Sequence, residues 1–106
     1  MTDSSSFGLH GKFTAQPGQR DQLVEVLLKA AKLMEAADGC RLYVVSTASD
    51  DEKAVWVTEI WDTKADHAAS LSLEGVLELI EQARPLIAAI SDRSEFEPVG
   101  GKGLPG

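Results

Sequence analysis

The sequence predicts an α+β domain in which a single sheet carries all the helices on one face, and two observations support this. Segments of alternating hydrophobicity and segments of helical spacing follow one another as strand, helix, strand, strand, helix, strand. This βαββαβ order is that of the ferredoxin-like fold. The length of 106 residues suits one domain with one core. We place the domain at residues 7–104 and expect residues 1–6 to form a flexible tail.

The first half of the chain contains the clearest secondary-structure signals. Phe7 to Thr14 alternates apolar and polar residues and predicts a strand. From about Gly18 to Ala37 apolar residues recur at helical spacing, which predicts a helix. Arg41 to Thr47 is rich in β-branched and aromatic residues, and the polar turn Ser49 to Glu52 joins it to a strand that ends at Trp61. These two strands are expected to form a hairpin.

Two helices are predicted after Trp61. Thr63 is a suitable N-cap and Asp66 follows three residues later, which predicts a short helix to about Leu71. Ser72 is placed to cap a second helix from Glu74 to about Ile90.

Prolines mark the end of the domain. Pro85 should kink or split the second helix, because proline lacks a backbone donor and clashes with the preceding turn. A last short strand is predicted from Ser94 to Val99, with Pro98 at its end.

The composition excludes several classes of protein. A net charge of −7 and a pI near 4.7 disfavour binding to nucleic acid or to anionic membranes, which requires clustered Lys and Arg. The mean hydropathy of −0.09 and the lack of a long apolar run argue against a membrane span. Cys40 is the only cysteine and the N-terminal residues do not resemble a signal peptide, so we expect a cytoplasmic location.

The strand that ends at Trp61 carries a carboxylate among apolar residues. Its alternation places Val55, Val57, Glu59 and Trp61 on one face. Burying a carboxylate costs several kcal/mol unless it is paired or protonated. We therefore expect Glu59 to face a cavity, a cation or a partner subunit. The candidate cations are Lys12, Arg41 and Arg84.

The other face of the same strand also carries large apolar groups, Trp56 and Ile60 among them. Helices can cover only one face of the sheet. An uncovered aromatic patch favours association, so we predict a homodimer in which two sheets pack together.

Short motifs spread along the chain resemble the antibiotic biosynthesis monooxygenase family. They are Pro17-Gly18, Gly39-Cys40, Tyr43, Glu59-Ile60-Trp61, His67-Ala68-Ala69-Ser70-Leu71, Arg84-Pro85-Leu86-Ile87 and the glycine-rich segment before Leu104. The resemblance covers about Phe7 to Leu104. It implies a dimeric α/β barrel. Characterised members oxidise aromatic phenols or quinols with molecular oxygen and without metal or flavin, whereas others degrade haem or have no known activity.

The resemblance also implies a site. Such an enzyme needs a base, a donor for oxyanions and a dry aromatic pocket. We predict His67, Glu59, Trp61 and Ser70 as catalytic residues and Tyr43, Leu71 and Phe13 as substrate-binding residues. Many relatives carry a histidine at the position of Ser70, whereas this chain has His67 one turn earlier. No metal and no cofactor is predicted, because the two histidines and the cysteine are scattered.

Alternative interpretations stay open for each of these residues. His67 could be a local capping histidine, the two tryptophans could be core or interface aromatics, and Glu59 could sit in an ion pair. The leading hypothesis is a monooxygenase acting on a small aromatic phenol or quinol with molecular oxygen. The alternative is a non-catalytic dimeric protein of the same fold that binds a ligand or acts under stress. Haem degradation is disfavoured, because the chain lacks the asparagine found in those relatives.

Overall fold

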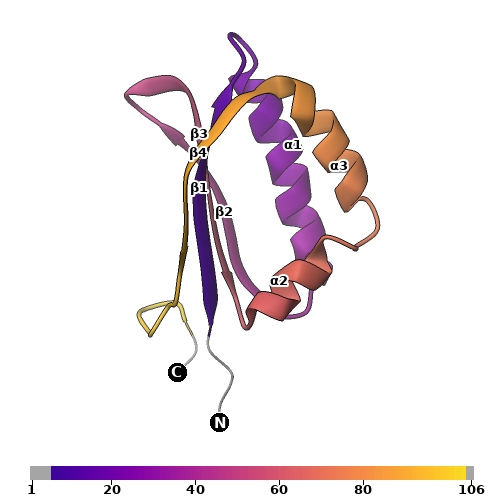
Figure 1. Ribbon diagram of the computed structural model, residues 1–106, viewed down its shortest axis with the longest axis vertical. Coiled ribbons are helices and arrows are strands. Elements are labelled where there is room, and N and C mark those ends of the chain that lie inside the picture. Colours follow the sequence, from indigo (N-terminus) through magenta and orange to yellow (C-terminus); the bar gives the residue numbers. More distant parts are fainter. Residues whose placement is uncertain (1–5, 105–106) are drawn as a thin grey trace.

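The computed structural model describes residues 6–104 and shows a four-stranded antiparallel sheet with all its helices on one side (Figure 1). The elements are β1 (Phe7–Ala15), α1 (Arg20–Leu33), β2 (Cys40–Ala48), β3 (Asp51–Trp61), α2 (Lys64–Ser70), α3 (Val76–Ala83) and β4 (Ile87–Phe96), with 3₁₀ turns at Met34–Ala36 and Arg84–Leu86. The strand order β2-β3-β1-β4 is that of the ferredoxin-like fold. The predicted fold class is confirmed. The predicted N-terminal tail falls almost wholly outside the described residues.

The register of the central strands defines the two faces of the sheet. Phe7 stands opposite Trp61, and Phe13 stands opposite Val55. Because alternate residues of a strand point to opposite faces, this row of side chains points toward the helices, and we call that side the inner face. His10 opposite Thr58 and Lys12 opposite Trp56 belong to the outer face. The predicted alternation of β3 is therefore confirmed.

The core lies between the inner face and α1. Leu23 of α1 and Val55 of β3 are fully buried and belong to one apolar cluster. A second cluster joins Phe7, Trp61 and Met34 near the end of β3. Each fully buried aliphatic side chain contributes about 1.5–3 kcal/mol relative to an exposed one. These two clusters fix α1 and α3 against the sheet.

The start of α2 follows the capping signal in the sequence. The Thr63 side chain accepts a hydrogen bond from the backbone N–H of Asp66, at 3.0 Å. The predicted N-cap is thus confirmed. This cap fixes the first turn of α2 directly after β3, and so determines where His67 lies.

The helix predicted from Glu74 to Ile90 is wrong at both ends. Its N-cap is Gly75, at a φ of +93° that favours glycine, and Ser72 makes no capping bond there. The α-helix ends at Ala83, and Pro85 lies in the 3₁₀ turn that follows. Proline has therefore ended the α-helix rather than kinked it.

The last strand is longer than predicted and begins earlier. β4 spans Ile87–Phe96, so the prediction of Ser94 to Val99 is wrong and Pro98 lies beyond the strand. Short apolar runs such as Ile87 to Ile90 fit a helical stripe and a strand equally well by periodicity alone. Backbone pairing with β1 makes this run a strand.

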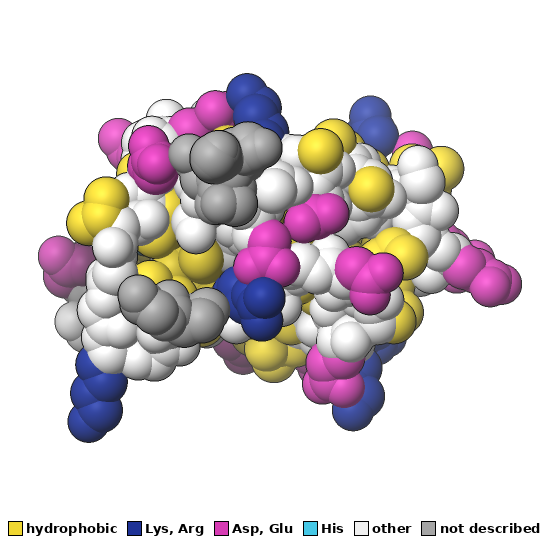
Figure 2. Space-filling view, turned by 90° about the horizontal axis from the view of Figure 1, so that it is seen from below, with side chains coloured by type: hydrophobic (Ala, Val, Ile, Leu, Met, Phe, Trp, Pro, Cys, Tyr) yellow, Lys and Arg dark blue, Asp and Glu magenta, His cyan; other side chains and the backbone are white. Residues whose placement is uncertain are grey.

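The outer face of the sheet has no helix over it (Figure 1). Trp56 is partly buried there, whereas Val44 and Phe96 are 44% and 40% exposed. At the end of the molecule where β1 begins and β4 ends, acidic side chains are spread among apolar ones (Figure 2). None of the helices within residues 6–104 is both long enough and apolar enough to span a bilayer.

Candidate functional site

A cavity of about 400 Å³ lies between the inner face of the sheet and the helices. Its volume is in the usual range for small-ligand sites. The wall is largely apolar: Phe13, Val26, Leu27, Ala30, Met34, Leu71, Val76, Leu79, Ile80, Ala83, Ile87 and Ile90. A few polar side chains complete it: Tyr43, Glu59, His67, Ser70 and Arg84. A small apolar molecule with a few polar groups fits such a wall.

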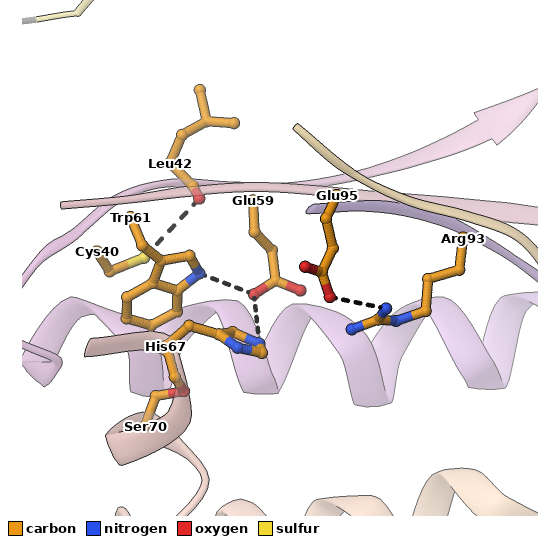
Figure 3. Close-up of polar contacts among 8 residues, drawn as sticks. All are labelled: Cys40, Leu42, Glu59, Trp61, His67, Ser70, Arg93 and Glu95. Atoms are coloured by element: carbon orange, nitrogen blue, oxygen red, sulfur yellow. Dashed lines mark hydrogen bonds and ion pairs between the residues drawn. The ribbon is translucent and has the colours of Figure 1, made fainter. Parts of the chain in front are cut away.

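Glu59 is the acid of the cavity. β3 directs it to the inner face, where its side chain is only 12% exposed. Its Oε1 accepts a hydrogen bond from the indole Nε1–H of Trp61, at 3.0 Å (Figure 3). Trp61 is fully buried and does not line the cavity itself. The indole therefore supports the carboxylate from behind and holds one of its oxygens in place.

His67 lies beside this carboxylate. Its Nε2 is 3.7 Å from Oε1 of Glu59, and its side chain is 19% exposed (Figure 3). The imidazole also contacts two aromatic rings, that of Phe7 at 5.4 Å and that of Trp61 at 5.5 Å between centroids. The ring is thus confined on several sides while it still reaches the cavity. A histidine next to a carboxylate can accept a proton and keep the resulting charge balanced.

Ser70 uses its hydroxyl within α2. The Ser70 Oγ–H donates to the carbonyl oxygen of His67, at 2.6 Å. Ser70 is buried and lines the cavity. This hydrogen bond holds the hydroxyl in place one turn away from the imidazole.

Burial dominates the electrostatics of the site. It raises the pKa of Glu59, against the opposing effects of the Trp61 hydrogen bond and of the His67 and Arg93 charges. Burial, together with the charge of Glu59, also raises the pKa of the Tyr43 phenol. The Cys40 thiol has a raised pKa for the same two reasons, burial first. Both groups are therefore held in their neutral forms, and Cys40 has none of the features of a reactive thiolate.

The ion-pair partners proposed for Glu59 from the sequence are wrong, because each cation pairs elsewhere. Arg41 binds Asp62 at 2.9 Å, Arg84 binds Glu81 at 3.1 Å and Lys12 lies 3.4 Å from Asp51. All three acids lie near their cations in the fold, and only Glu81 of α3 is an exposed residue. The cation that acts on Glu59 besides His67 is Arg93 of β4.

The structure brings the predicted site residues together. Six of the seven line the cavity, namely His67, Glu59, Ser70, Tyr43, Leu71 and Phe13. Trp61 stands one layer behind them. Ile87 and Ile90 also line the cavity and were not predicted to do so, because their apolar spacing fits a helix. For the same reason the sequence did not predict that Ile87, Ile90 and Arg93 share one strand.

Among residues 6–104, no three His, Cys, Asp or Glu side chains gather in a way that could hold a metal ion. The cavity wall contains a His–Glu pair that faces an apolar space. The pair can take a proton from a hydroxyl group of a bound ligand, and the apolar wall can exclude water from the resulting anion.

The sequence model of the antibiotic biosynthesis monooxygenase family matches residues 6–82. A candidate antibiotic biosynthesis monooxygenase from Chloroflexus aurantiacus J-10-fl is 46% identical, with a TM-score of 0.88 over 95% of this chain and 100% of that chain. No functionally curated protein matches the sequence closely enough to count as a relative.

More distant structures share the fold. PA3566 from Pseudomonas aeruginosa is 19% identical, with a TM-score of 0.82 over 94% of this chain and 100% of that one. SnoaB, a cofactor-independent oxygenase from Streptomyces nogalater, is 14% identical, with a TM-score of 0.79 over 92% of this chain and 97% of that one. At these identities the likeness concerns the fold alone.

Proposed function

The chain belongs to the antibiotic biosynthesis monooxygenase family, and we propose that it oxidises a small aromatic phenol or quinol with molecular oxygen, without metal or flavin. The observation that carries this proposal is the Glu59–His67 pair at the wall of a largely apolar cavity. The description of SnoaB, a protein of the same fold, as a cofactor-independent oxygenase supports the same chemistry.

The first step of the proposed reaction is removal of a proton from the substrate. His67 accepts the proton of the ring hydroxyl at Nε2, and Glu59 balances the charge of the imidazolium that forms. The separation of 3.7 Å between Nε2 and Oε1 is longer than a hydrogen bond. Catalytic pairs are often this loose without ligand and tighten on binding. The Trp61 indole keeps Glu59 in place during this step.

The second step uses the electron-rich anion as the reductant. One electron passes from the phenolate to O₂, and the resulting radical and superoxide combine to form a carbon–oxygen bond. The peroxide anion takes back the proton held by His67, and the hydroperoxide that forms then loses water and leaves a quinone. One phenol and one O₂ give one quinone and one H₂O, so the substrate supplies all the electrons. The apolar wall protects the charged intermediates from bulk water.

Oxygen uptake with a panel of naphthols, anthrones and hydroquinones tests the proposal. We expect uptake proportional to protein for at least one compound, together with the absorbance of its quinone. Activity should survive dialysis against a chelator. Loss of turnover on chelation that one added metal restores would contradict the cofactor-free mechanism.

One observation favours a second function, the binding of an aromatic ligand without turnover. The Ser70 hydroxyl and Oε1 of Glu59 are both engaged in internal hydrogen bonds, as structural groups would be. Under this alternative the cavity binds aromatic compounds and no compound that binds is consumed. Measuring binding and oxygen uptake on the same compounds separates the two functions.

We also propose that the protein is a homodimer joined through the outer faces of two sheets. The uncovered face with Trp56, Val44 and Phe96 supports this. A cytoplasmic location and the lack of nucleic-acid binding stay predictions from the sequence.

A further inference from the structure

A bulge in β4 changes which side chains of that strand reach the inner face. Lys12 stands opposite Ser91, and His10 stands opposite Ser94. Two residues of β4, Asp92 and Arg93, therefore face the single Gly11 of β1. Asp92 takes a φ of +51°, a left-handed conformation that Asp tolerates better than most residues. This is the pattern of a β-bulge, in which one extra residue is inserted into one strand.

The bulge places a basic residue, Arg93, at an inner-face position of β4 that an acidic residue, Asp92, would otherwise occupy. In an uninterrupted register Asp92 would lie opposite Gly11 on the inner face, and Arg93 would lie opposite His10 on the outer face. With the extra residue, Arg93 takes the inner position instead. Its side chain extends to the same side of the sheet as those of Glu59 and Glu95 (Figure 3). The charge of Arg93 also lowers the pKa of Glu59.

Arg93 pairs with Glu95, an acid that it shares with Lys64. Glu95 binds Nη1 of Arg93 at 3.1 Å and Nζ of Lys64 at 3.3 Å. These two hydrogen bonds lower the pKa of Glu95, so this acid is ionised. Two cations thus share one carboxylate. Within residues 6–104 the hydrogen bonds of Arg93 use Nη1 only, and the rest of its guanidinium fork is available to a ligand.

We propose that Arg93 forms a subsite for an acidic substituent, a carboxylate or a sulfonate, on the aromatic ligand of the cavity. Ile87 and Ile90 of the same strand line the cavity, whereas Arg93 is not one of the lining residues and lies three residues beyond Ile90 on the inner face, where it can meet a substituent that extends from a ring held against Ile90. The planar guanidinium matches such anions in shape and charge. The inference deepens the proposed function by naming a substrate class, aromatic acids, in a protein whose net charge is −7.

Arg84 is the competing candidate. It lines the cavity, but its guanidinium is held by Glu81 at 3.1 Å in a one-to-one pair. Arg93 shares its acid with Lys64, and its charge lowers the pKa of Glu59. We therefore assign the anion to Arg93 rather than to Arg84.

Two dyes of the same ring skeleton test the inference without any turnover. 8-Anilino-1-naphthalenesulfonate carries a sulfonate, and N-phenyl-1-naphthylamine lacks it; both fluoresce in apolar surroundings. We expect the wild-type protein to bind the sulfonate tighter. Arg93→Gln should weaken binding of the sulfonate by about tenfold or more, as expected for loss of a charge-assisted hydrogen bond, and should change binding of the neutral dye by less than about twofold. Because the Arg93 side chain is 55% exposed, this variant should fold.

Arg41→Gln is the matched control, because Arg41 pairs with Asp62 and does not line the cavity. It should leave both dyes unaffected. Deletion of Asp92, which removes the extra residue, should reproduce the effect of Arg93→Gln where the variant folds. An unchanged sulfonate affinity in Arg93→Gln, equal weakening of both dyes, or loss of the preference in Arg84→Gln instead would each overturn the inference.

The dye-binding test can fail without the proposed oxidation failing, and the oxidation can fail without the subsite failing. A neutral quinol has no acidic substituent for the subsite to bind, so a lack of oxygen uptake by the wild-type protein beside a preserved preference for the sulfonate would count against the oxidation only. Conversely, uptake on neutral quinols with equal affinity for both dyes would retain the oxidation and reject the subsite.

Discussion

On each face of the sheet a strand tryptophan contacts a histidine, and the two tryptophan–histidine pairs differ in their neighbours. On the inner face the rings of Trp61 and His67 lie 5.5 Å apart, edge to face. On the outer face the rings of Trp56 and His10 are stacked 4.8 Å apart. Both pairs combine the same two residue types. Their surroundings therefore decide what each can do.

The inner pair is buried beside an acid, whereas the outer pair lies beside a hydroxyl and a cation. Oε1 of Glu59 contacts both members of the inner pair, at 3.0 Å from Nε1 of Trp61 and 3.7 Å from Nε2 of His67. On the outer face, Nδ1 of His10 is 2.9 Å from Oγ1 of Thr58, and the Lys12 ammonium lies 5.9 Å from the Trp56 ring. A carboxylate in an apolar cavity favours proton transfer, while a flat, uncovered aromatic face favours association. Residue type alone therefore does not identify a site.

The largest expected difference between the two faces concerns stability. Replacing Trp61 by Ala removes a fully buried ring and should cost about 3–5 kcal/mol of the free energy of unfolding. Trp56→Ala should cost clearly less in a dilute sample, because Trp56 is only partly buried within the chain. Urea denaturation of the two variants checks this. Equal losses would mean that the outer ring is as well packed as the inner one.

The next effect separates the two histidines by activity. His67→Ala should lower the turnover of a quinol by at least about 10²-fold, the usual contribution of a general base, and should leave the melting temperature nearly unchanged. His10→Ala on the outer face is the matched control and should keep the wild-type rate. Steady-state oxygen uptake measures both. An unaltered rate in His67→Ala would retire this residue as the base and direct attention to Glu59.

A smaller effect is expected for association. Trp56→Asp places a charge on the outer face and should weaken the proposed dimer by about 2 kcal/mol or more, roughly thirtyfold in the dissociation constant. Sedimentation of the wild type and the variant over a concentration series checks this. A wild-type protein that sediments only as an 11.3 kDa species at micromolar concentration would rule out the dimer.

The smallest effect is the pH dependence of stability at Glu59. Burial raises the pKa of this group above its ordinary value of 4.5, so the folded chain holds the proton more tightly than the unfolded chain. The resulting stabilisation is fully present below pH 4.5 and is lost as the pH rises through the folded-state pKa. The Glu59→Gln variant has no ionisable group at this position, so it cannot lose this stabilisation as the pH rises. Its stability relative to the wild type should therefore increase with pH above 4.5, and parallel stability curves for the two proteins would contradict the raised pKa.

Features that depend on neighbouring residues could be predicted from the sequence alone. The alternation in β3 placed Val55, Glu59 and Trp61 on one face, because side-chain direction in a strand is a local property. The cap at Thr63 predicted where α2 begins, since its hydrogen bond spans three residues. Together these two features already placed His67 near Trp61.

The tertiary structure alone decided what depends on pairing between distant segments. Ile87 to Ile90 fits a helix or a strand by periodicity, and only the hydrogen bonds with β1 make it a strand. The partner of Glu59 could not be chosen from three candidate cations, because each of them found a different acid in the folded chain. The bulge that turns Arg93 inward is a mismatch of one residue between β1 and β4, strands about 80 positions apart. Such a mismatch exists only once both strands are in place.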